Sequence, residues 1–232
     1  MNNAKEQVVK QIDEYDIQVL EFKEYGLKRL RASSWRPSAD AWAQMAMQWA
    51  STIVFEKPVA TYESTQTRRF LHGRTETTRS VSTASTEWVQ SMIDGSDFAR
   101  QKELLQRALK SHIQYTREAS VAQGVDRHFF GLSMCVENDS EMPDLFTDPV
   151  FTRSKNWRLS TSTLPGTSPG FGPVQDDGVG IGYDSFHGDV WFFTITARKE
   201  NNYVQPMRDE IERCLNKMAL FLDDDNPPSC RL

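Results

Sequence analysis

Two polar stretches of the chain contain the side chains best suited to binding a small charged substrate. The first covers residues 61–80 and reads TYESTQTRRFLHGRTETTRS, which combines Tyr62 with several hydroxyl groups and four arginines. Guanidinium groups form paired hydrogen bonds with carboxylates and phosphates, so this composition is typical of an anion pocket. It is equally typical of a solvated polar loop, and the residues alone leave both interpretations open.

The second stretch, RLSTSTLP at residues 158–165, has the composition of a strand. Alternate side chains of a strand point to opposite faces, which places Ser160 and Ser162 on one face and Thr161 on the other. On the wall of a cleft, such a hydroxyl would donate a hydrogen bond to a developing oxyanion. The alternative is an ordinary strand with small polar residues.

No general base is evident among the histidines, which are His72, His112, His128 and His187, because none is followed by an aspartate four positions later. The Walker loop, the Rossmann glycine fingerprint, the GxSxG elbow and clustered His/Cys metal ligands are also missing from the sequence. We therefore expect no metal. Each histidine is interpreted as a surface or core residue, with His112, on the apolar side of a helical pattern, as the best candidate for the core.

The composition is that of a globular protein, with 232 residues, 38% hydrophobic and 25% charged. The net charge of −5 argues against a nucleic-acid partner. No apolar run approaches the roughly 20 residues of a membrane span, and the first residues lack the layout of a secretory signal. We expect a soluble intracellular chain with reduced cysteines.

The first 135 residues are predicted to be mostly helical. An N-terminal helical pattern includes Val8, Ile12, Val19 and Leu20. Ser38 is predicted to cap a second helix. A third starts after Ser96 and ends at Gly124 in a left-handed conformation. The buried side of the second helix is predicted to contain Trp42, Met45, Trp49 and Ile53.

Strands are predicted to replace helices after residue 135. Five prolines between residues 143 and 173 exclude long helices, and residues 157–164 and 189–197 carry strand-type residues. VGIGYDSF and DVWFFTITA, joined through His187 and Gly188, predict a β-hairpin. A last amphipathic helix covers residues 207–222. The predicted fold is a single α+β domain.

With FGPV at residues 171–174 and GVDRH at 124–128, these stretches resemble the choline/carnitine acyltransferase family. The resemblance covers nearly the whole chain, in the order LEFKEYG, YES, GRTET, RS, DRH, LSTS, FGPV and DGVGIGY. Members have two related halves, each built like chloramphenicol acetyltransferase. The resemblance implies that residues 1–232 form the C-terminal half, a mixed β-sheet packed with helices, without the N-terminal half that supplies the catalytic histidine.

In that family the histidine deprotonates either the carnitine hydroxyl or the CoA thiol. The resemblance implies a carnitine O-acyltransferase that transfers a short- or medium-chain acyl group between CoA and carnitine, with CoA as co-substrate and no bound cofactor. General-base catalysis is worth about 10²–10⁴-fold, so we expect the chain alone to be inactive or nearly so. The alternative is a non-catalytic remnant that binds carnitine and CoA.

Carnitine is favoured over choline by three residues that the resemblance assigns to its carboxylate, namely Tyr62, Thr75 and Arg127. Choline acetyltransferases carry GRVDN and DNH at the corresponding places and so lack the hydroxyl and the charge. A choline enzyme remains the third interpretation. The resemblance further assigns Ser160 to the carboxylate, Ser162 to the oxyanion, and Phe171 to the trimethylammonium group through a cation–π contact.

The CoA contacts implied by the resemblance depart further from the family pattern. Arg29 and Ser33 stand where relatives have two lysines, upstream of Asp40, and Arg36 is a neighbouring cation. Ser64 would also touch CoA. Thr163 replaces the glutamine that many relatives have after STS.

Acyl-chain length and location are indicated only by short motifs. Pro169 and Gly170 match neither the methionine of short-chain enzymes nor the glycine of longer-chain ones, and we favour an open acyl tunnel. Cys230-Arg231-Leu232 resembles the tripeptide read by the peroxisomal import receptor. We therefore expect a peroxisomal location, with the cytoplasm or mitochondria as alternatives.

Overall fold

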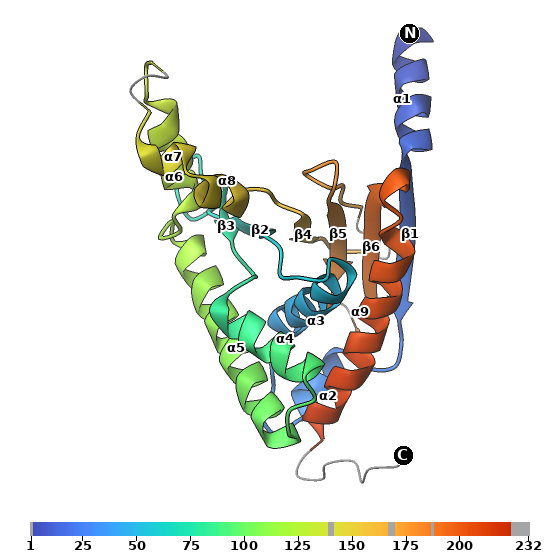
Figure 1. The fold of residues 1–232 in the computed structure, drawn as a ribbon. Coiled ribbons are helices and arrows are strands. Elements are labelled where there is room, and N and C mark those ends of the chain that lie inside the picture. Colours follow the sequence, from blue (N-terminus) through green and yellow to red (C-terminus); the bar gives the residue numbers. More distant parts are fainter. Residues whose placement is uncertain (1, 139–141, 167–169, 187, 224–232) are drawn as a thin grey trace.

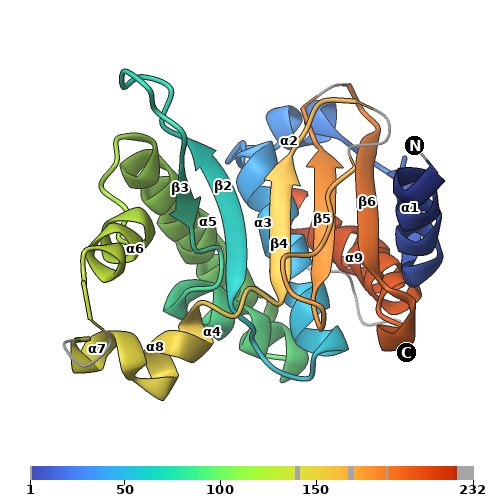
Figure 2. The same ribbon diagram turned by 90° about the horizontal axis from the view of Figure 1, so that it is seen from above.

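The computed structural model describes residues 2–138, 142–166, 170–186 and 188–223, which form a mixed sheet with helices on one face (Figures 1 and 2). The sheet has the strand order β1-β6-β5-β4-β2-β3. The β2–β4 and β4–β5 pairs are parallel, and the other pairs are antiparallel. The strands are β1 Tyr15–Phe22, β2 Thr61–Gln66, β3 Thr75–Thr78, β4 Leu159–Thr163, β5 Val179–Asp184 and β6 Trp191–Arg198.

Helices α3, α4, α5 and α9 lie on the same side of the sheet, whereas α6–α8 and α1 form two arms that rise on the other side (Figure 1). In the part of the chain described, no helix is long and apolar enough to cross a membrane. The α-helices are α1 Asn2–Glu14, α2 Leu27–Ala32, α3 Ala39–Val54, α4 Thr83–Ile93, α5 Phe98–Ser120, α6 Asp126–Met134, α7 Asp144–Thr147, α8 Pro149–Ser154 and α9 Val204–Met218. Two 3₁₀ turns, η2 Lys199–Asn201 and η3 Ala219–Leu222, precede and follow α9.

The core lies between these helices and the sheet. Helix α3 begins where predicted, because the Ser38 hydroxyl accepts a hydrogen bond from the backbone N–H of Ala41. Its Trp42 and Met45 side chains are fully buried. The predicted hairpin is the antiparallel β5–β6 pair, and the predicted last helix is α9.

Some of the predicted helices are wrong. Val19 and Leu20 belong to β1, which pairs with β6 along its whole length, so the first helix ends at Glu14. The long helix α5 is capped by Asp97 rather than Ser96 and ends at Ser120. The left-handed residue after it is Ala122 (φ 59°), not Gly124. Strands β2 and β3 lie in the region predicted to be mostly helical.

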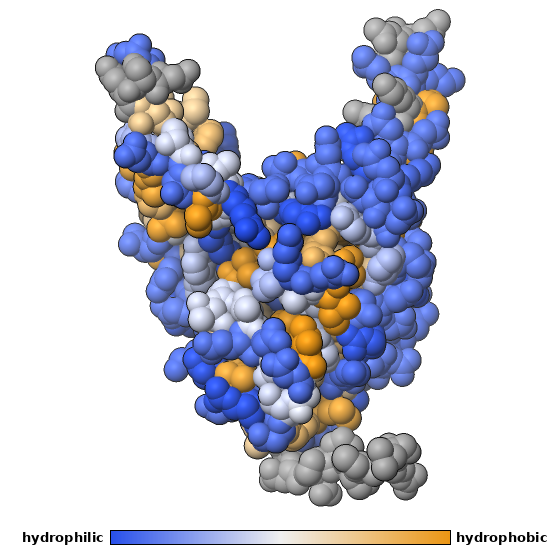
Figure 3. Space-filling model, in the orientation of Figure 1, coloured by the Kyte–Doolittle hydropathy of each residue, from blue (hydrophilic) through white to orange (hydrophobic). Residues whose placement is uncertain are grey.

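The two faces of the sheet differ in what covers them. We call the face against α3, α4, α5 and α9 the covered face, and the other the open face, which is turned towards the viewer in Figure 2. The space-filling view shows a hollow between the two arms on the open side (Figure 3). Strand alternation and register place on the open face Tyr62, Ser64, Ser160, Ser162, Gly180, Gly182, Thr194 and Thr196.

Candidate functional site

Tyr62, Thr75 and Arg127 come together from β2, β3 and the first turn of α6. Arg127 Nη2 lies 3.3 Å from the Tyr62 hydroxyl and 3.2 Å from Thr75 Oγ1. Arg127 Nε donates to the Thr75 carbonyl at 3.0 Å. We call these three residues the carboxylate cluster. Its guanidinium is exposed and forms no ion pair within the described chain, so it is available to an anion from solution.

The backbone below Arg127 is held by the buried carboxylate of Glu76. This carboxylate accepts hydrogen bonds from the backbone N–H groups of Thr77 at 2.6 Å and of Arg127 at 3.3 Å. Gly124 permits this approach, since a Cβ atom there would lie 2.4 Å from Glu76 Cγ. Glu76 therefore sets the position from which Arg127 reaches the cluster.

An aromatic wall supports the other side of the carboxylate cluster. The Trp157 ring packs edge-to-face against Tyr62, with 5.7 Å between centroids. The Arg79 guanidinium lies 4.6 Å from the Trp157 ring and forms a two-bond ion pair with Asp126, at 2.6 and 2.9 Å. The residue preceding Arg127 is thus anchored as well, which keeps α6 against β3.

The serines of β4 lie on the open face beside Tyr62, and the predicted alternation along β4 is confirmed. Ser160 stands opposite Tyr62 in the parallel register, and its buried hydroxyl has no hydrogen-bond partner among the described residues. Ser162 Oγ lies 3.5 Å from Ser64 Oγ. Thr161 points to the covered face, where it accepts a hydrogen bond from Gln44.

Phe171 lies elsewhere on the open face. It lines a pocket that the carboxylate cluster does not line. Gly180 permits the segment that carries Phe171 to cross β5, since a Cβ atom there would lie 2.2 Å from the Gly172 carbonyl carbon. The residues around this pocket are Ile12, Tyr15, Ile17, Gly170, Gly172, Pro173, Thr194 and Thr196.

The residues assigned to CoA do not gather in one place. Arg29 forms a two-bond ion pair with Asp223, with both distances 3.0 Å, and Ser33 donates to the Leu30 carbonyl. Arg36 is exposed with a φ of 41°. Asp40 and Thr163 bond to each other at 3.1 Å, and Ser64 faces Ser162. A role in CoA binding stays a prediction for all six residues.

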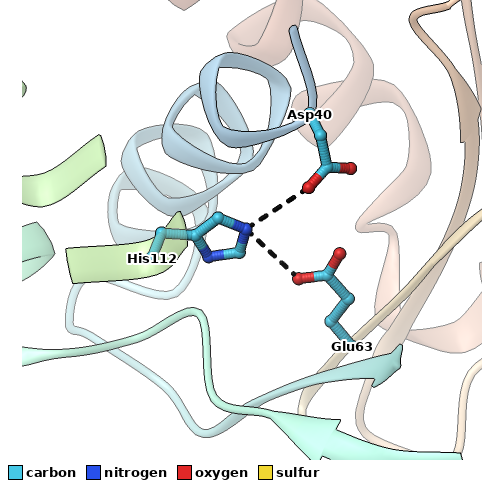
Figure 4. Close-up of side chains that lie close together, drawn as sticks. All are labelled: Asp40, Glu63 and His112. Atoms are coloured by element: carbon cyan, nitrogen blue, oxygen red, sulfur yellow. Dashed lines mark hydrogen bonds and ion pairs between the residues drawn. The ribbon is translucent and has the colours of Figure 1, made fainter. Parts of the chain in front are cut away.

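Sequence reasoning missed a second charged group, on the covered face. His112 Nε2 lies 3.4 Å from Asp40 Oδ2 and 3.5 Å from Glu63 Oε2 (Figure 4). We call these residues the buried cluster. His112 is buried, as predicted, but it is paired with charged groups rather than packed among apolar ones. The sequence did contain a signal for Glu63. In a strand that reads TYES, side chains alternate between faces, so Glu63 points to the face opposite Tyr62 and Ser64.

Burial and charge compete in setting the pKa values of the buried cluster. Burial raises the pKa of Glu63 to about 7, and the nearby Asp40 charge adds to the rise. Burial lowers the pKa of His112, but the Glu63 and Asp40 carboxylates outweigh it and hold the value above the usual one. Burial also raises the pKa of Asp40, but hydrogen bonds and charge from His112, with help from Tyr183 and Thr163, bring it below its ordinary value.

Among the described residues, the buried cluster is also the group whose geometry would suit a metal ion. One ligand atom from each of Asp40, Glu63 and His112 lies within 4.8 Å of the others. The same side chains contact one another and also form hydrogen bonds with Tyr183 and Thr163. The cluster therefore needs no ion to bring it together.

Comparison with known proteins identifies the relatives of this chain. Residues 1–213 match the family described as Choline/Carnitine o-acyltransferase. Carnitine O-acetyltransferase of Rattus norvegicus is 35% identical over all of the chain, which covers 37% of that protein. Mitochondrial carnitine O-acetyltransferase of Saccharomyces cerevisiae is 37% identical over 79% of the chain and 28% of its own length. Peroxisomal carnitine O-octanoyltransferase of Bos taurus is 35% identical over 71% of the chain and 27% of its length.

Two solved structures resemble the chain at low sequence identity. One described as the crystal structure of CT covers 89% of the chain, with 13% identity and a TM-score of 0.50. A chloramphenicol acetyltransferase covers 91%, with 11% identity and a TM-score of 0.43. The predicted α+β class and mixed sheet packed with helices are confirmed. The chain spans about a third of the length of its curated relatives, and it belongs to the choline/carnitine acyltransferase family.

Proposed function

We propose that this chain is the C-terminal, carnitine-binding portion of a carnitine O-acyltransferase that moves a short- or medium-chain acyl group between CoA and carnitine. The observation that carries the proposal is the carboxylate cluster, in which an exposed guanidinium and two hydroxyls converge within 3.3 Å. A carboxylate gains charge-assisted hydrogen bonds there. Choline has no group that would satisfy the Arg127 charge.

The β4 serines support the same proposal. The hydroxyl of Ser160 is buried beside Tyr62 and has no partner in the part of the chain that the structure describes. It would bond the carnitine carboxylate, because an unsatisfied buried hydroxyl is costly. Ser162 would donate to the oxyanion. Phe171 would contact the trimethylammonium group, which requires carnitine to extend across the open face towards the Phe171 pocket.

The general base is proposed to come from the part of the relatives that this chain does not cover. His112 is buried between two carboxylates, out of reach of a substrate on the open face. His72 and His128 are exposed, and His187 lies outside the described residues. The chain alone is then inactive or nearly so.

A peroxisomal location rests on the tripeptide Cys230-Arg231-Leu232, which also lies outside the described residues.

Calorimetric titration of the purified chain with L-carnitine and with choline tests this proposal. Wild-type chain should bind carnitine and not choline, and Thr75→Val with Arg127→Asn should abolish carnitine binding. The matched control is Arg117→Asn, an exposed arginine on α5, which should bind as the wild type does. Equal binding of both ligands by wild type, or choline binding gained by the double variant, would favour the choline interpretation.

The enzyme is separated from a non-catalytic binding remnant by assaying acyl transfer with and without a separately produced N-terminal half of a relative. Transfer that appears only with the added half supports the proposal. No transfer in either case supports the remnant. Transfer by the chain alone at ordinary enzyme rates contradicts the argument about the general base.

A further inference from the structure

The buried cluster joins three elements that are distant in sequence. Asp40 lies in the first turn of α3, Glu63 in β2 and His112 in the middle of α5. Tyr183 of β5 donates to Asp40 at 2.6 Å and lies 3.3 Å from Glu63. The hydroxyl of Ser80 donates to Glu63 at 3.2 Å. The polar groups that face the cluster thus come from α3, β2, β4, β5, α5 and the segment after β3.

Within the described residues, the imidazole at position 112 is the one group in contact with both carboxylates that can carry a positive charge. The Asp40 and Glu63 carboxylates have oxygen atoms within 4.8 Å of each other, and at this distance two buried negative charges repel strongly. No lysine or arginine contacts them within the described residues. The titratable groups facing the imidazole are Asp40 and Glu63, and Tyr183 contacts both of these carboxylates. A single imidazolium Nε2–H shared between both carboxylates compensates the pair, whereas with a neutral imidazole the pair is relieved only if one carboxylate takes up a proton.

The cluster is also connected to the residues of the pocket. Glu63 lies between Tyr62 and Ser64 in β2, so holding Glu63 on one face holds its neighbours on the other. Thr163, next to Ser162, donates to Asp40 at 3.1 Å. Gln44 links Tyr183 to Thr161, whose hydroxyl donates to the Tyr62 carbonyl at 3.1 Å.

The buried cluster lies at the point where the backbone pairing between β2 and β4 ends. Pairing between β2 and β4 covers only Thr61–Glu63 against Leu159–Thr161. Beyond it the two strands diverge (Figure 2). Ser64 and Ser162 lie just past the last pair, and backbone pairing between their strands does not hold them.

We propose that His112 is a positioning residue, whose imidazolium draws Asp40 and Glu63 together on the covered face and so fixes the diverging ends of β2 and β4 on the open face. Only the identity of the ligand bound there rests on the proposed function. The competing interpretations are a histidine that merely fills space in the core and a site for a metal ion.

A double-mutant cycle separates charge from space-filling. His112→Gln should raise the equilibrium constant of unfolding on the order of 100-fold or more, because it leaves two buried carboxylates uncompensated. Adding Glu63→Gln to this variant should lower the equilibrium constant of unfolding again by roughly tenfold or more, since it removes the repulsion between the two carboxylates. Additive effects of the two changes contradict the proposal. The matched control is Glu76→Gln, a buried carboxylate outside the cluster, which should not rescue His112→Gln.

Nitrogen-15 NMR of histidine-labelled wild-type chain does not depend on whether the variants fold. One imidazole should carry protons on both ring nitrogens at pH 7.5 and should not shift on adding carnitine. A chain whose histidines are all neutral at that pH would overturn the proposal. Added Zn²⁺ that binds stoichiometrically and shifts this signal would overturn it in favour of a metal site.

Hydrogen exchange tests the effect on the pocket. His112→Gln should speed exchange of the backbone amides at 61–65 and 160–163, whereas those of α9 should exchange as in wild type. The double variant should restore protection. If exchange in the two strands does not change, the positioning role is wrong. If wild type fails to bind carnitine while the coupling between positions 112 and 63 is found, the proposed function fails and the positioning role stands.

Discussion

Two charged clusters lie on opposite faces of β2, one built from Tyr62 and the other from its neighbour Glu63. On the open face, Arg127 is exposed and pairs with no anion among the described residues, and its hydroxyl partners leave it free to bind one. On the covered face, His112 is buried between two carboxylates. An unpaired charge is tolerated in water but not in the core, so the first cluster suits binding and the second suits holding the fold.

Removing the cation from each cluster should have the largest effect. His112→Leu should lower the free energy of unfolding by about 3–5 kcal/mol, because it strands two buried carboxylates. Arg127→Leu should change it by no more than about 0.5 kcal/mol, as is usual for an exposed side chain. Urea denaturation of both variants measures the difference. Similar losses in the two would show that the carboxylate cluster also stabilises the fold.

The buried cluster should also make the stability of the chain depend on pH. The pKa of Glu63 rises from 4.5 to about 7 on folding, so the folded chain binds the extra proton. Its contribution is fully present below pH 4.5 and is lost as pH rises through about 7. Stability should therefore fall by roughly 1–3 kcal/mol across this range, and Glu63→Gln should flatten the fall. Urea unfolding at a series of pH values checks it.

His112 and Asp40 also contribute to the pH dependence of stability, at higher and lower pH respectively. The raised pKa of His112 gives stability that is fully present below pH 6.5 and is lost at higher pH, as pH rises through the raised pKa of the folded histidine. The lowered pKa of Asp40 gives stability that is present above pH 3.8 and lost in acid. A profile that keeps rising from pH 4.5 to 8 would contradict both the Glu63 and the His112 arguments.

The elements that sequence reasoning predicted correctly are those whose signals are local. The Ser38 cap, the apolar stripe of α3, the β5–β6 hairpin and α9 each depend on residues close together in the chain. Strand β1 was missed because its partner is β6, and Tyr15 pairs with Arg198. Strands β2 and β3 were missed because they lie in a polar stretch. Their covered-face positions are filled by Glu63, Glu76 and threonines rather than by apolar residues, so the usual alternation of apolar and polar residues is absent.

The two clusters were not equally accessible to sequence reasoning. Sequence spacing does not indicate that Tyr62, Thr75 and Arg127 lie together, since Arg127 is 65 and 52 residues from its two partners. Only the family resemblance predicted that they form one site.

In the buried cluster, Glu63 lies in the YES motif and Asp40 was assigned to CoA, but no motif connected these two residues to each other or to His112. Its members follow from which face of β2 and α5 is covered, and that depends on how the helices pack on the sheet.

Gly124 offers a smaller change that affects the open face through the backbone. Gly124→Ala would place a Cβ atom 2.4 Å from Glu76 Cγ, and the acid that holds the Arg127 backbone would have to move. We expect a loss of about 1–3 kcal/mol in stability together with weaker carnitine binding, measured by urea denaturation and calorimetry. Glu76→Ala in the same chain relieves the contact and should recover stability but not binding. Recovery of both would mean that Glu76 does not position Arg127.

The smallest change separates binding from stability most cleanly. Tyr62→Phe keeps the ring that packs on Trp157 and removes only the hydroxyl 3.3 Å from Arg127. The free energy of unfolding should stay within about 0.5 kcal/mol of wild type. Carnitine binding should weaken roughly tenfold, the worth of one hydrogen bond to a charged group. Calorimetric titration beside urea denaturation measures both. Unchanged binding would remove Tyr62 from the carboxylate cluster, and lost stability would mean that the hydroxyl supports the fold rather than the ligand.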